Sequence, residues 1–531
     1  MALHMVDDPQ DQEDYNDNSG GGGGNRNTGG GGGGGLLAFI PLLLSLFGRG
    51  GKGGGGGKGL LILLVLGAGA YFVLGRGGCG GGLGDVAQNI FSQSGYSYSP
   101  EQFSKASVYE GLEDNNTKNP LPEAVSLAAF APERRNQGKQ GSCVAWSSAY
   151  AARTILEASS TRTDPNQIAY SPAFLYNNIA LESCQGSYLL NAMQFMQKSG
   201  AVSYQDFPYD ENDCSRQAAS NLFQKASTNK IHGFTRLTET DDVNGINIRA
   251  IKEHLAKDAP VVIGMMVGGS FMQPMMGAKV WHPTSDDQNQ TGFGGHAMCV
   301  IGYNDRVEGG AFEIMNSWGP EWGQNGIAFV RYGDFKEFVR EAYGIDPLPK
   351  KGAALNVALE CLVGLINNDT KQNIALKPAG ANIFKTVNPI KKGDKFKIEI
   401  KNNSECYIYI FTPDVNNKSF VLFPYKPIHS SYCGITGYRL FPRKESIMAD
   451  DIGNKEVMGI VVSKQELDYN AVNTAINNST QTEYSTKLNE ALAATVDKNV
   501  NYSAGANGSI QFRASGSGNS VVTTIVEIDK Q

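Results

Sequence analysis

Residues 136–146 read Asn-Gln-Gly-Lys-Gln-Gly-Ser-Cys-Val-Ala-Trp. Within this stretch, Cys143 follows a Gly-Ser pair at the start of a helix that the apolar spacing predicts over Cys143–Ser159. The reactive form of cysteine is the thiolate, and the N-terminus of a helix stabilises its negative charge. Taken alone, the stretch fits a buried core cysteine better than a nucleophile.

Two later stretches carry polar side chains next to apolar strands. Residues 294–303 place His296 after two glycines, at the mouth of a predicted strand. Residues 316–319 read Asn-Ser-Trp-Gly and follow the next strand. Each has an ordinary explanation, because histidines occur at strand ends and asparagines in turns. An asparagine can also hold an imidazole by a hydrogen bond, and a nearby tryptophan can shield that bond from water.

Together the three stretches resemble the papain family of cysteine peptidases, whose functional residues follow the order Gln, Cys, His, Asn. His296 lies 153 residues after Cys143, and Asn316 lies 173 residues after it. The family's usual separation is about 130–150 residues, so modest insertions are implied. The resemblance covers about 220 residues, and the joint match is far more specific than any single stretch.

The resemblance implies a catalytic role for four residues. Cys143 is the nucleophile, and His296 is its general base and later the acid for the leaving amine. Asn316 orients the imidazole. Gln137 and the backbone N–H of Cys143 donate to the oxyanion.

The resemblance also implies four substrate-binding residues. Gly186 and Ser187 correspond to a glycine-rich strip along the substrate groove. Ser187 replaces a glycine there, which predicts narrower access for a substrate backbone. Gly295 flanks the groove beside the histidine, and Trp318 covers the hydrogen bond between the histidine and the asparagine.

The sequence departs from the family's pattern near the nucleophile. Gln140 stands where the family has a structural cysteine, so the usual disulfide to the segment near Cys184 cannot form. A disulfide between Cys184 and Cys214 fits the family outside the cytoplasm, with two free thiols as the alternative. Residues 85–125 are too short and too polar for the family's helical inhibitory prosegment, and the sequence does not show whether they cross the cleft.

The predicted fold class is α+β, with a two-lobed papain-like domain over residues 126–348 and a separate β-sandwich-like domain over residues 355–531. In the first domain, helices precede strands: the helices are Cys143–Ser159, Ser171–Leu181, Tyr188–Lys198 and Ile248–Leu255, and the strands are Val261–Val267, Met298–Tyr303, Phe312–Met315 and Ile327–Arg331. The second domain alternates apolar strands with Asn, Gly and Pro clusters and holds one polar helical insert over residues 464–493. It resembles β-rich modules that bacteria fuse to peptidases.

The N-terminal part has a different composition. Residues 1–59 are acidic and then Gly-rich, which predicts a disordered head. Residues 60–74 are 15 uncharged residues, predicted to be one transmembrane helix, with a buried core helix or strand as the alternative. Residues 75–125 are predicted to be a linker. More basic residues precede the apolar run than follow it, which predicts a single-pass protein of a bacterial inner membrane with the peptidase domain outside the cytoplasm.

Composition narrows the function classes. The 531 residues include 46 basic and 52 acidic ones, a net charge of −6, which argues against a nucleic-acid partner. No pair of histidines has metal-ligand spacing, so we expect neither a metal nor another cofactor.

The predicted function is a membrane-tethered cysteine endopeptidase. Its expected partners are a peptide or protein substrate and the membrane, and the partner of the second domain is open. Two alternatives remain. One is an inactive papain-like scaffold that only binds peptides, and the other is a transpeptidase, since an amine can capture the acyl-enzyme in place of water.

Overall fold

The structure, a computed structural model, describes residues 4–7, 95–238, 245–350, 359–514 and 520–531. All of them belong to one compact unit, Met1–Gln12 with Gln88–Gln531. The predicted anchor at 60–74 and most of the predicted head lie outside the described residues. Among the residues that are described, no helix is long and apolar enough to cross a membrane.

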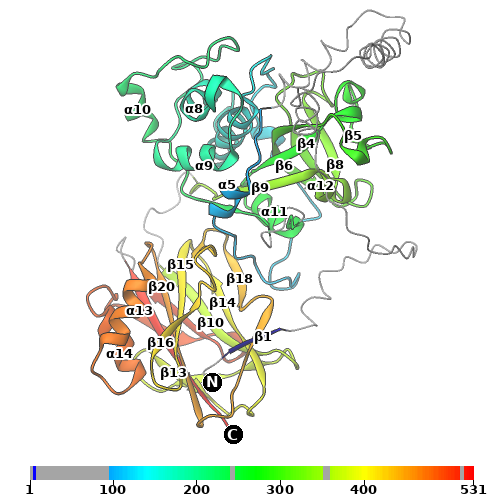
Figure 1. Cartoon of the computed structure of the whole chain (residues 1–531). Helices are drawn as coiled ribbons and strands as arrows, with labels where there is room; N and C mark the ends of the chain where they lie inside the picture. The colour runs from blue at the N-terminus through cyan, green and yellow to red at the C-terminus, as the bar shows by residue number, and fades with distance from the viewer. Residues whose placement is uncertain (1–3, 8–94, 239–244, 351–358, 515–519) are drawn as a thin grey trace, which may run out of the picture. The chain divides into compact units, whose positions relative to one another are not determined.

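Helices form the first lobe of the peptidase-like domain. A continuous helix begins at Cys143 as α6 and η3, where η3 is a π-helical stretch, and it ends as α7 just before Arg162, which has a left-handed φ of 60°. Ser171 caps the next helix by accepting a hydrogen bond from the backbone N–H of Phe174. The bounds are α6 Cys143–Ala145, η3 Trp146–Arg153, α7 Thr154–Thr161, α8 Pro172–Ile179, α9 Leu189–Lys198 and α10 Ser220–Ala226. Figure 1 shows α8, α9 and α10 together on one side of this domain.

A mixed sheet with helices α11 and α12 forms the second lobe, on the other side of the same domain in Figure 1. The strand order is β3-β9-β4-β6-β7-β8-β5. The bounds are β3 Phe234–Arg236, α11 Ile248–Leu255, β4 Val261–Val267, β5 Val280–Trp281, β6 Gly294–Asn304, β7 Ala311–Met315, β8 Ile327–Arg331, α12 Tyr332–Phe338 and β9 Val339–Ile345. The predicted two-lobed arrangement is therefore present.

Strand β6 is longer than predicted at its N-terminal end, and this extension carries the candidate histidine. The prediction began the strand at Met298, but the ladder to β4 already pairs Val267 with Gly294 and Met265 with His296. Backbone groups in a buried sheet need partners, and β4 provides them along this whole stretch. His296 is consequently the third residue of β6 and pairs with Met265 of β4, while β7 joins the ladder only from Cys299 onward.

Two sheets that share one hydrophobic core form the region after residue 358. The first has the order β1-β19-β14-β10-β22-β21, in which β1 is the N-terminal strand His4–Asp7, and the second has the order β12-β13-β23-β20-β15-β16. The longest strands are β10 Leu359–Asn367, β14 Lys395–Asn402, β15 Cys406–Pro413, β20 Lys455–Ser463 and β23 Val521–Asp529; shorter ones are β12 Leu376–Pro378, β13 Ile383–Thr386, β16 Ser419–Phe423, β18 Gly437–Phe441, β19 Glu445–Met448, β21 Val500–Ala504 and β22 Ile510–Ala514.

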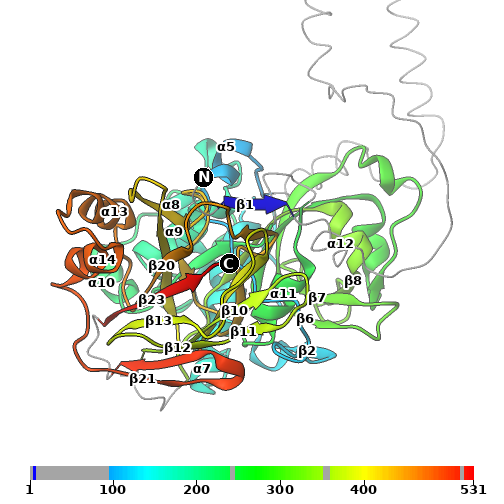
Figure 2. The ribbon, with the colours of Figure 1, turned by 90° about the horizontal axis from the view of Figure 1, so that it is seen from below.

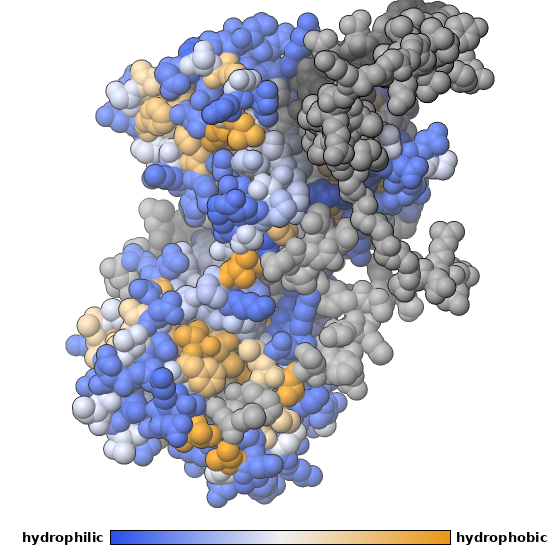
Figure 3. Space-filling model, viewed as in Figure 1, coloured by the Kyte–Doolittle hydropathy of each residue, from blue (hydrophilic) through white to orange (hydrophobic). Residues whose placement is uncertain are grey.

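The predicted helical insert of this region is a pair of helices, α13 Tyr469–Asn478 and α14 Tyr484–Leu492, which lie side by side in Figure 2. Asp468 caps the first of them by accepting hydrogen bonds from two backbone N–H groups. The face of the molecule drawn in Figure 3 is mostly hydrophilic, and its hydrophobic areas are small and separated. The apolar residues of both cores are accordingly buried.

The structure corrects two predictions about the N-terminal part. Residues 4–7 form strand β1 (His4–Asp7), which pairs antiparallel with β19, so these four residues of the predicted head are ordered by a sheet edge. Residues 95–125 are more than a linker. They contain helix α5 (Pro100–Lys105) and strand β2 (Ala124–Ser126), and β2 pairs with the part of β6 that extends beyond β4.

Candidate active site

Cys143 is the first residue of α6 and is completely buried. The backbone N–H of Ala297, on β6 in the opposite lobe, points to its Sγ at 3.3 Å. The residue directly after His296 therefore contacts the sulfur, although 154 positions separate the two in the sequence. The fold brings the predicted nucleophile and the predicted histidine to the same point between the lobes.

His296 is held on two sides. Its Nε2 lies 2.7 Å from Oδ1 of Asn316, and its ring stacks on the ring of Trp318 with 4.3 Å between centroids. An amide oxygen only accepts hydrogen bonds, so Nε2 carries a proton and Nδ1 is the basic nitrogen of the neutral ring. The predicted arrangement of histidine, asparagine and tryptophan is present, and it fixes both the orientation and the tautomer of the imidazole.

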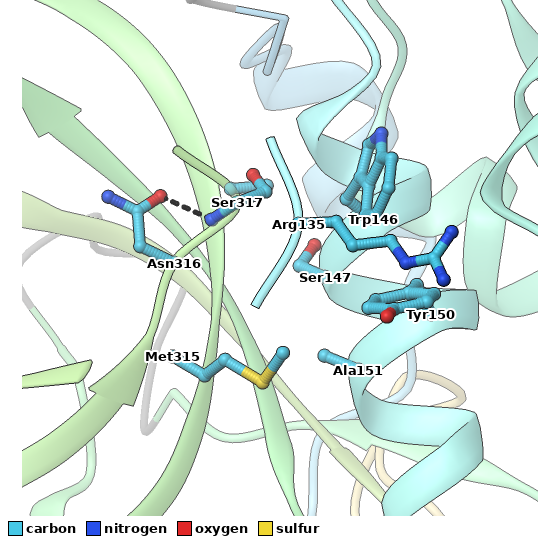
Figure 4. A pocket seen from close by; sticks show the side chains of 9 residues that line it. Arg135, Trp146, Ser147, Tyr150, Ala151, Met315, Asn316 and Ser317 are labelled. Carbon is cyan, nitrogen blue, oxygen red and sulfur yellow. Dashed lines mark hydrogen bonds between the residues drawn. The ribbon is translucent and has the colours of Figure 1, made fainter. Parts of the chain in front are cut away.

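The end of β7 supports this arrangement, and Figure 4 shows it facing the helix that begins at Cys143. Oδ1 of Asn316 also accepts a hydrogen bond from the backbone N–H of Ser317 at 2.7 Å, drawn as a dashed line. Trp146 and Tyr150, from the π-helical stretch, line the other side of the small pocket in that view. Side chains of both lobes therefore meet directly beside the candidate site.

Gln137 lies in the loop before the nucleophile and is also buried. Its Nε2 donates to the backbone carbonyl of Gln140 at 3.0 Å, and its Oε1 accepts from the hydroxyl of Ser317 at 2.7 Å. The hydroxyl of Tyr209 donates to the carbonyl of Gln137 at 2.7 Å and lies 2.6 Å from the hydroxyl of Ser142. These bonds position the amide group of Gln137 firmly, and no sequence motif predicted this contact of Tyr209.

A disulfide between Cys184 and Cys214 closes the loop beside the glycine-rich strip, so the predicted pairing is present and the free-thiol alternative is wrong. The hydroxyl of Tyr176 donates to the carbonyl of Cys184 at 2.7 Å and lies 3.2 Å from the backbone nitrogen of Gly186. These contacts hold the strip in place. Gly186 itself has a left-handed φ of 88°, which favours glycine.

The segment of residues 95–98 lies on the predicted substrate-binding residues. The backbone N–H of Ser187 donates to the carbonyl of Gly95 at 2.9 Å, and the N–H of Ser97 donates to the carbonyl of Ser187 at 3.1 Å. The N–H of Tyr96 donates to the carbonyl of Gly295 at 3.2 Å. The main chain of the 95–98 segment thus uses the hydrogen-bonding groups that a bound peptide would need.

The approach of the 95–98 segment is close enough to require glycine. A methyl group on Gly95 would lie 2.0 Å from the carbonyl oxygen of Gly141, and one on Gly186 would lie 2.4 Å from the carbonyl oxygen of Gly95. Both backbone groups of Ser187 are bonded to the 95–98 segment. The serine was predicted to narrow the access of a neighbouring backbone, but it leaves room for this one. A substrate could take this place only after the 95–98 segment has moved away.

The state of the Cys143 sulfur follows from this cover. Burial raises the pKa of the Cys143 thiol to about 11, although backbone N–H groups of Ala297 and Gly95 that point at the sulfur act to lower the pKa. The helix start was expected to favour the thiolate. In this state burial outweighs that effect, because the charged form of the sulfur has no access to water.

We therefore expect alkylation of Cys143 to depend steeply on pH in the unaltered chain. Because the pKa lies at about 11, the thiolate fraction grows about tenfold per unit between about pH 7 and about pH 9. The rate of modification by iodoacetamide, followed by mass spectrometry of the peptide that contains Cys143, should grow in the same proportion. An alkylation rate that stays constant over this pH range would contradict a raised pKa of the Cys143 thiol.

A buried thiol at a helix start, an imidazole fixed by an amide and a groove that pairs with an extended main chain define a cysteine peptidase. Residues 122–344 match the family model described as papain family cysteine protease. The chain therefore carries a papain-family cysteine protease domain and is a hydrolase of that class.

Curated relatives match about two fifths of the chain. A cathepsin B-like protein of Giardia intestinalis is 27% identical over 219 residues, which are 39% of this chain and 68% of the relative. Cathepsin K of Mus musculus is 28% identical over 214 residues, 40% of this chain and 60% of the relative. Among solved structures, xylellain, a cysteine protease from Xylella fastidiosa, is 21% identical and covers 49% of this chain and 98% of its own, with a TM-score of 0.40.

Proposed function

We propose that this protein is an endopeptidase that hydrolyses peptide bonds by acyl transfer through Cys143. The observation that carries the proposal is the contact of the Cys143 sulfur with the backbone beside His296, an imidazole whose Nε2 is bonded to Asn316. Nucleophile, base and orienting group are then in the arrangement that covalent catalysis requires. The test is cleavage of a peptide library by the full chain, compared with the Cys143→Ala variant.

The proposed reaction starts with the transfer of the thiol proton to Nδ1 of His296. The thiolate attacks the carbonyl carbon of the substrate, and the resulting oxyanion accepts hydrogen bonds from Nε2 of Gln137 and the backbone N–H of Cys143. The imidazolium then gives its proton to the leaving amine. Water, activated by His296, releases the acid product from the sulfur.

Asn316 and Trp318 act on the imidazole in this proposal. The bond from Nε2 to Asn316 stays intact while Nδ1 gains and loses the proton, so the ring keeps its direction throughout the cycle. The stacked ring of Trp318 keeps water away from that bond. Gly186, Ser187 and Gly295 bind the substrate main chain in place of the 95–98 segment.

We further propose that residues 60–74 anchor the protein in a bacterial inner membrane, with the peptidase domain outside the cytoplasm. The support is the run of 15 uncharged residues and the excess of basic residues before it. A chain that lacks residues 60–74 should move from the membrane fraction to the soluble fraction of the expressing cells. Recovery of both chains in the same fraction would contradict the anchor.

A further inference from the structure

Residues 137–142, which we call the oxyanion loop, connect the two groups that are proposed to bind the oxyanion. The first residue of the loop, Gln137, provides a side-chain amide, and the last, Ser142, directly precedes the backbone N–H of Cys143. Both Gln137 and Ser142 are completely buried. The loop contains no cysteine, so no disulfide fixes it. Other groups of the chain must therefore keep the two donors at a constant separation.

The hydroxyl of Tyr209 joins the two ends of the oxyanion loop. It donates to the backbone carbonyl of Gln137 at 2.7 Å and lies 2.6 Å from the hydroxyl of Ser142. A tyrosine hydroxyl has one proton, and because that proton goes to Gln137, the hydroxyl of Ser142 is the donor in the second bond. One oxygen atom thus connects the residue that carries the amide donor with the residue that precedes the backbone donor.

The ring and the proton of Tyr209 both have a fixed place. The ring makes an edge contact with the ring of Trp146, with 4.9 Å between centroids, and Trp146 belongs to the helix that begins at Cys143. Burial raises the pKa of Tyr209 to about 12, so the hydroxyl keeps the proton that it donates. Tyr209 is therefore a constant donor that packs against the same helix as the nucleophile.

The two residues that follow this tyrosine bind the middle of the oxyanion loop. The carbonyl of Asp210 accepts a hydrogen bond from Nε2 of Gln140 at 3.4 Å. Oε2 of Glu211 accepts one from the backbone N–H of Lys139 at 2.7 Å. Residues 209–211, which we call the supporting turn, therefore contact the oxyanion loop at its middle as well as at its ends.

The supporting turn is tied to the helical lobe on both sides. Before it, the carbonyl of Phe207 accepts a hydrogen bond from the hydroxyl of Ser171, and the ring of Phe207 contacts the ring of Phe174 on α8. After it, Cys214 forms the disulfide with Cys184. The supporting turn thus has a fixed position from which it can hold the oxyanion loop.

We propose that Tyr209 is a positioning residue of this peptidase, which holds the amide of Gln137 and the backbone N–H of Cys143 at the separation that the oxyanion requires. This inference rests on the proposed function. An amide nitrogen carries two N–H groups, so the bond of Nε2 to the carbonyl of Gln140 is compatible with donation to an oxyanion. Ser317, labelled in Figure 4, donates to Oε1 and thereby fixes which side of the amide carries the nitrogen.

The kinetic tests use the full chain with Tyr96→Ala, so that substrate can enter the groove. The ring of Tyr96 holds the 95–98 segment in place, because it fills the space beside Gly264 and Gly295, where a methyl group would lie 2.3 Å and 2.9 Å from ring atoms. Its hydroxyl donates to Oε1 of Glu341 at 2.7 Å. The substitution removes these contacts, and none of the bonds between the supporting turn and the oxyanion loop involves Tyr96.

The test is a double-mutant cycle of Tyr209→Phe and Gln137→Ala in this background. We expect Gln137→Ala alone to lower kcat about 100-fold and Tyr209→Phe alone about tenfold, with KM nearly unchanged, because the oxyanion forms only after binding. The separation of two donors no longer matters when one is absent, so the double variant should be hardly slower than Gln137→Ala. A further tenfold fall in the double variant would overturn the inference, and so would an unchanged kcat in Tyr209→Phe.

Tyr303→Phe is the matched control. The hydroxyl of Tyr303 also belongs to a buried ring and donates to a backbone carbonyl, that of Pro122, at 2.6 Å, but it lies near the far end of β6 from His296. This variant should lose similar thermal stability and keep kcat, because its hydroxyl does not contact the oxyanion loop. Equal falls in kcat for Tyr303→Phe and Tyr209→Phe would show a general loss of structure and would overturn the positioning role.

A binding measurement without turnover distinguishes this inference from the proposed function. When a peptide aldehyde binds, the Cys143 sulfur forms a bond to the carbonyl carbon, the C=O double bond becomes a single bond, and the thiol proton goes to the oxygen. That oxygen then lies where the oxyanion would form, so Tyr209→Phe should weaken aldehyde binding about tenfold and leave binding of the matching peptide alcohol unchanged.

The possible outcomes of this measurement are separate for the two proposals. Weaker aldehyde binding in Tyr209→Phe, in a chain that hydrolyses no peptide, would refute the proposed reaction and retain the role of Tyr209. Hydrolysis by a chain whose aldehyde binding is the same with and without Tyr209→Phe would refute the role of Tyr209 and retain the reaction.

Discussion

Replacing Cys143 by alanine is expected to lower the rate of peptide cleavage by at least about 10⁴-fold, because no other group described at the site can form the acyl intermediate. The measurement is kcat/KM on a peptide that the Tyr96→Ala variant cleaves, with both substitutions in one chain. Binding of the same peptide should persist, since the sulfur contributes little to the bonds that Ser187 and Gly295 offer to a main chain.

A matched control is available on strand β6. Cys299 is also buried, but it lies farther along the strand than His296 and Ala297, and its partners in the sheet are Val262 and Met315. Cys299→Ala should therefore retain activity and lose only some stability. If Cys143→Ala retained both cleavage and the biological role of the protein, the catalytic proposal would fail. Retention of the biological role alone would favour a peptide-binding scaffold.

Replacing Tyr96 by alanine is expected to raise kcat/KM of the full chain about 100-fold. Loss of a buried aromatic side chain costs about 3–5 kcal/mol, and this cost falls on the docked position of the 95–98 segment. The segment then leaves the groove more often, so substrate competes for Ser187 and Gly295 with less opposition. Tyr96→Phe removes only the bond to Glu341 and should raise the rate about tenfold.

The change in the 95–98 segment can be observed without substrate. The N–H groups of Tyr96 and Ser97 donate to Gly295 and Ser187, so both amides should exchange with deuterium faster in Tyr96→Ala. Tyr98→Ala serves as the control, because Tyr98 is only half-buried and its ring contacts Phe103. Faster exchange without faster cleavage would show that the segment does not limit access to the nucleophile.

Sequence patterns predicted the elements that have clear local signals. The bounds of α11, β4 and β8 agree with the predictions, because the apolar spacing is regular and because Asn247 caps the helix. The strands β9 and β10 were not predicted. In β10, Cys361, Val363 and Leu365 point toward the core, but Leu362 and Gly364 lie between them, so the run lacks the apolar–polar alternation that predicts a strand.

The candidate site was predicted in part. The motifs around Cys143, His296 and Asn316 predicted three residues that the fold brings together, because each motif is carried by residues that are neighbours in the sequence. Tyr96 and Glu341 could not be found in this way. They are 245 residues apart and meet only because an irregular segment crosses the groove, which no periodic pattern encodes. The main sequence signal for this contact is that Gly95 precedes the aromatic residue Tyr96. Both lie in residues 85–125, a stretch too short to be the family's inhibitory prosegment.

The small residue at position 264 links two properties of the enzyme. Any side chain there would push the aromatic ring out, because even one methyl group would come within 2.3 Å of it. The same substitution would also fill the space beside Gly295 that the ring of Tyr96 now occupies. In the proposed enzyme, a mutation at this position would therefore release the 95–98 segment and at the same time reduce the room left in the groove for a substrate.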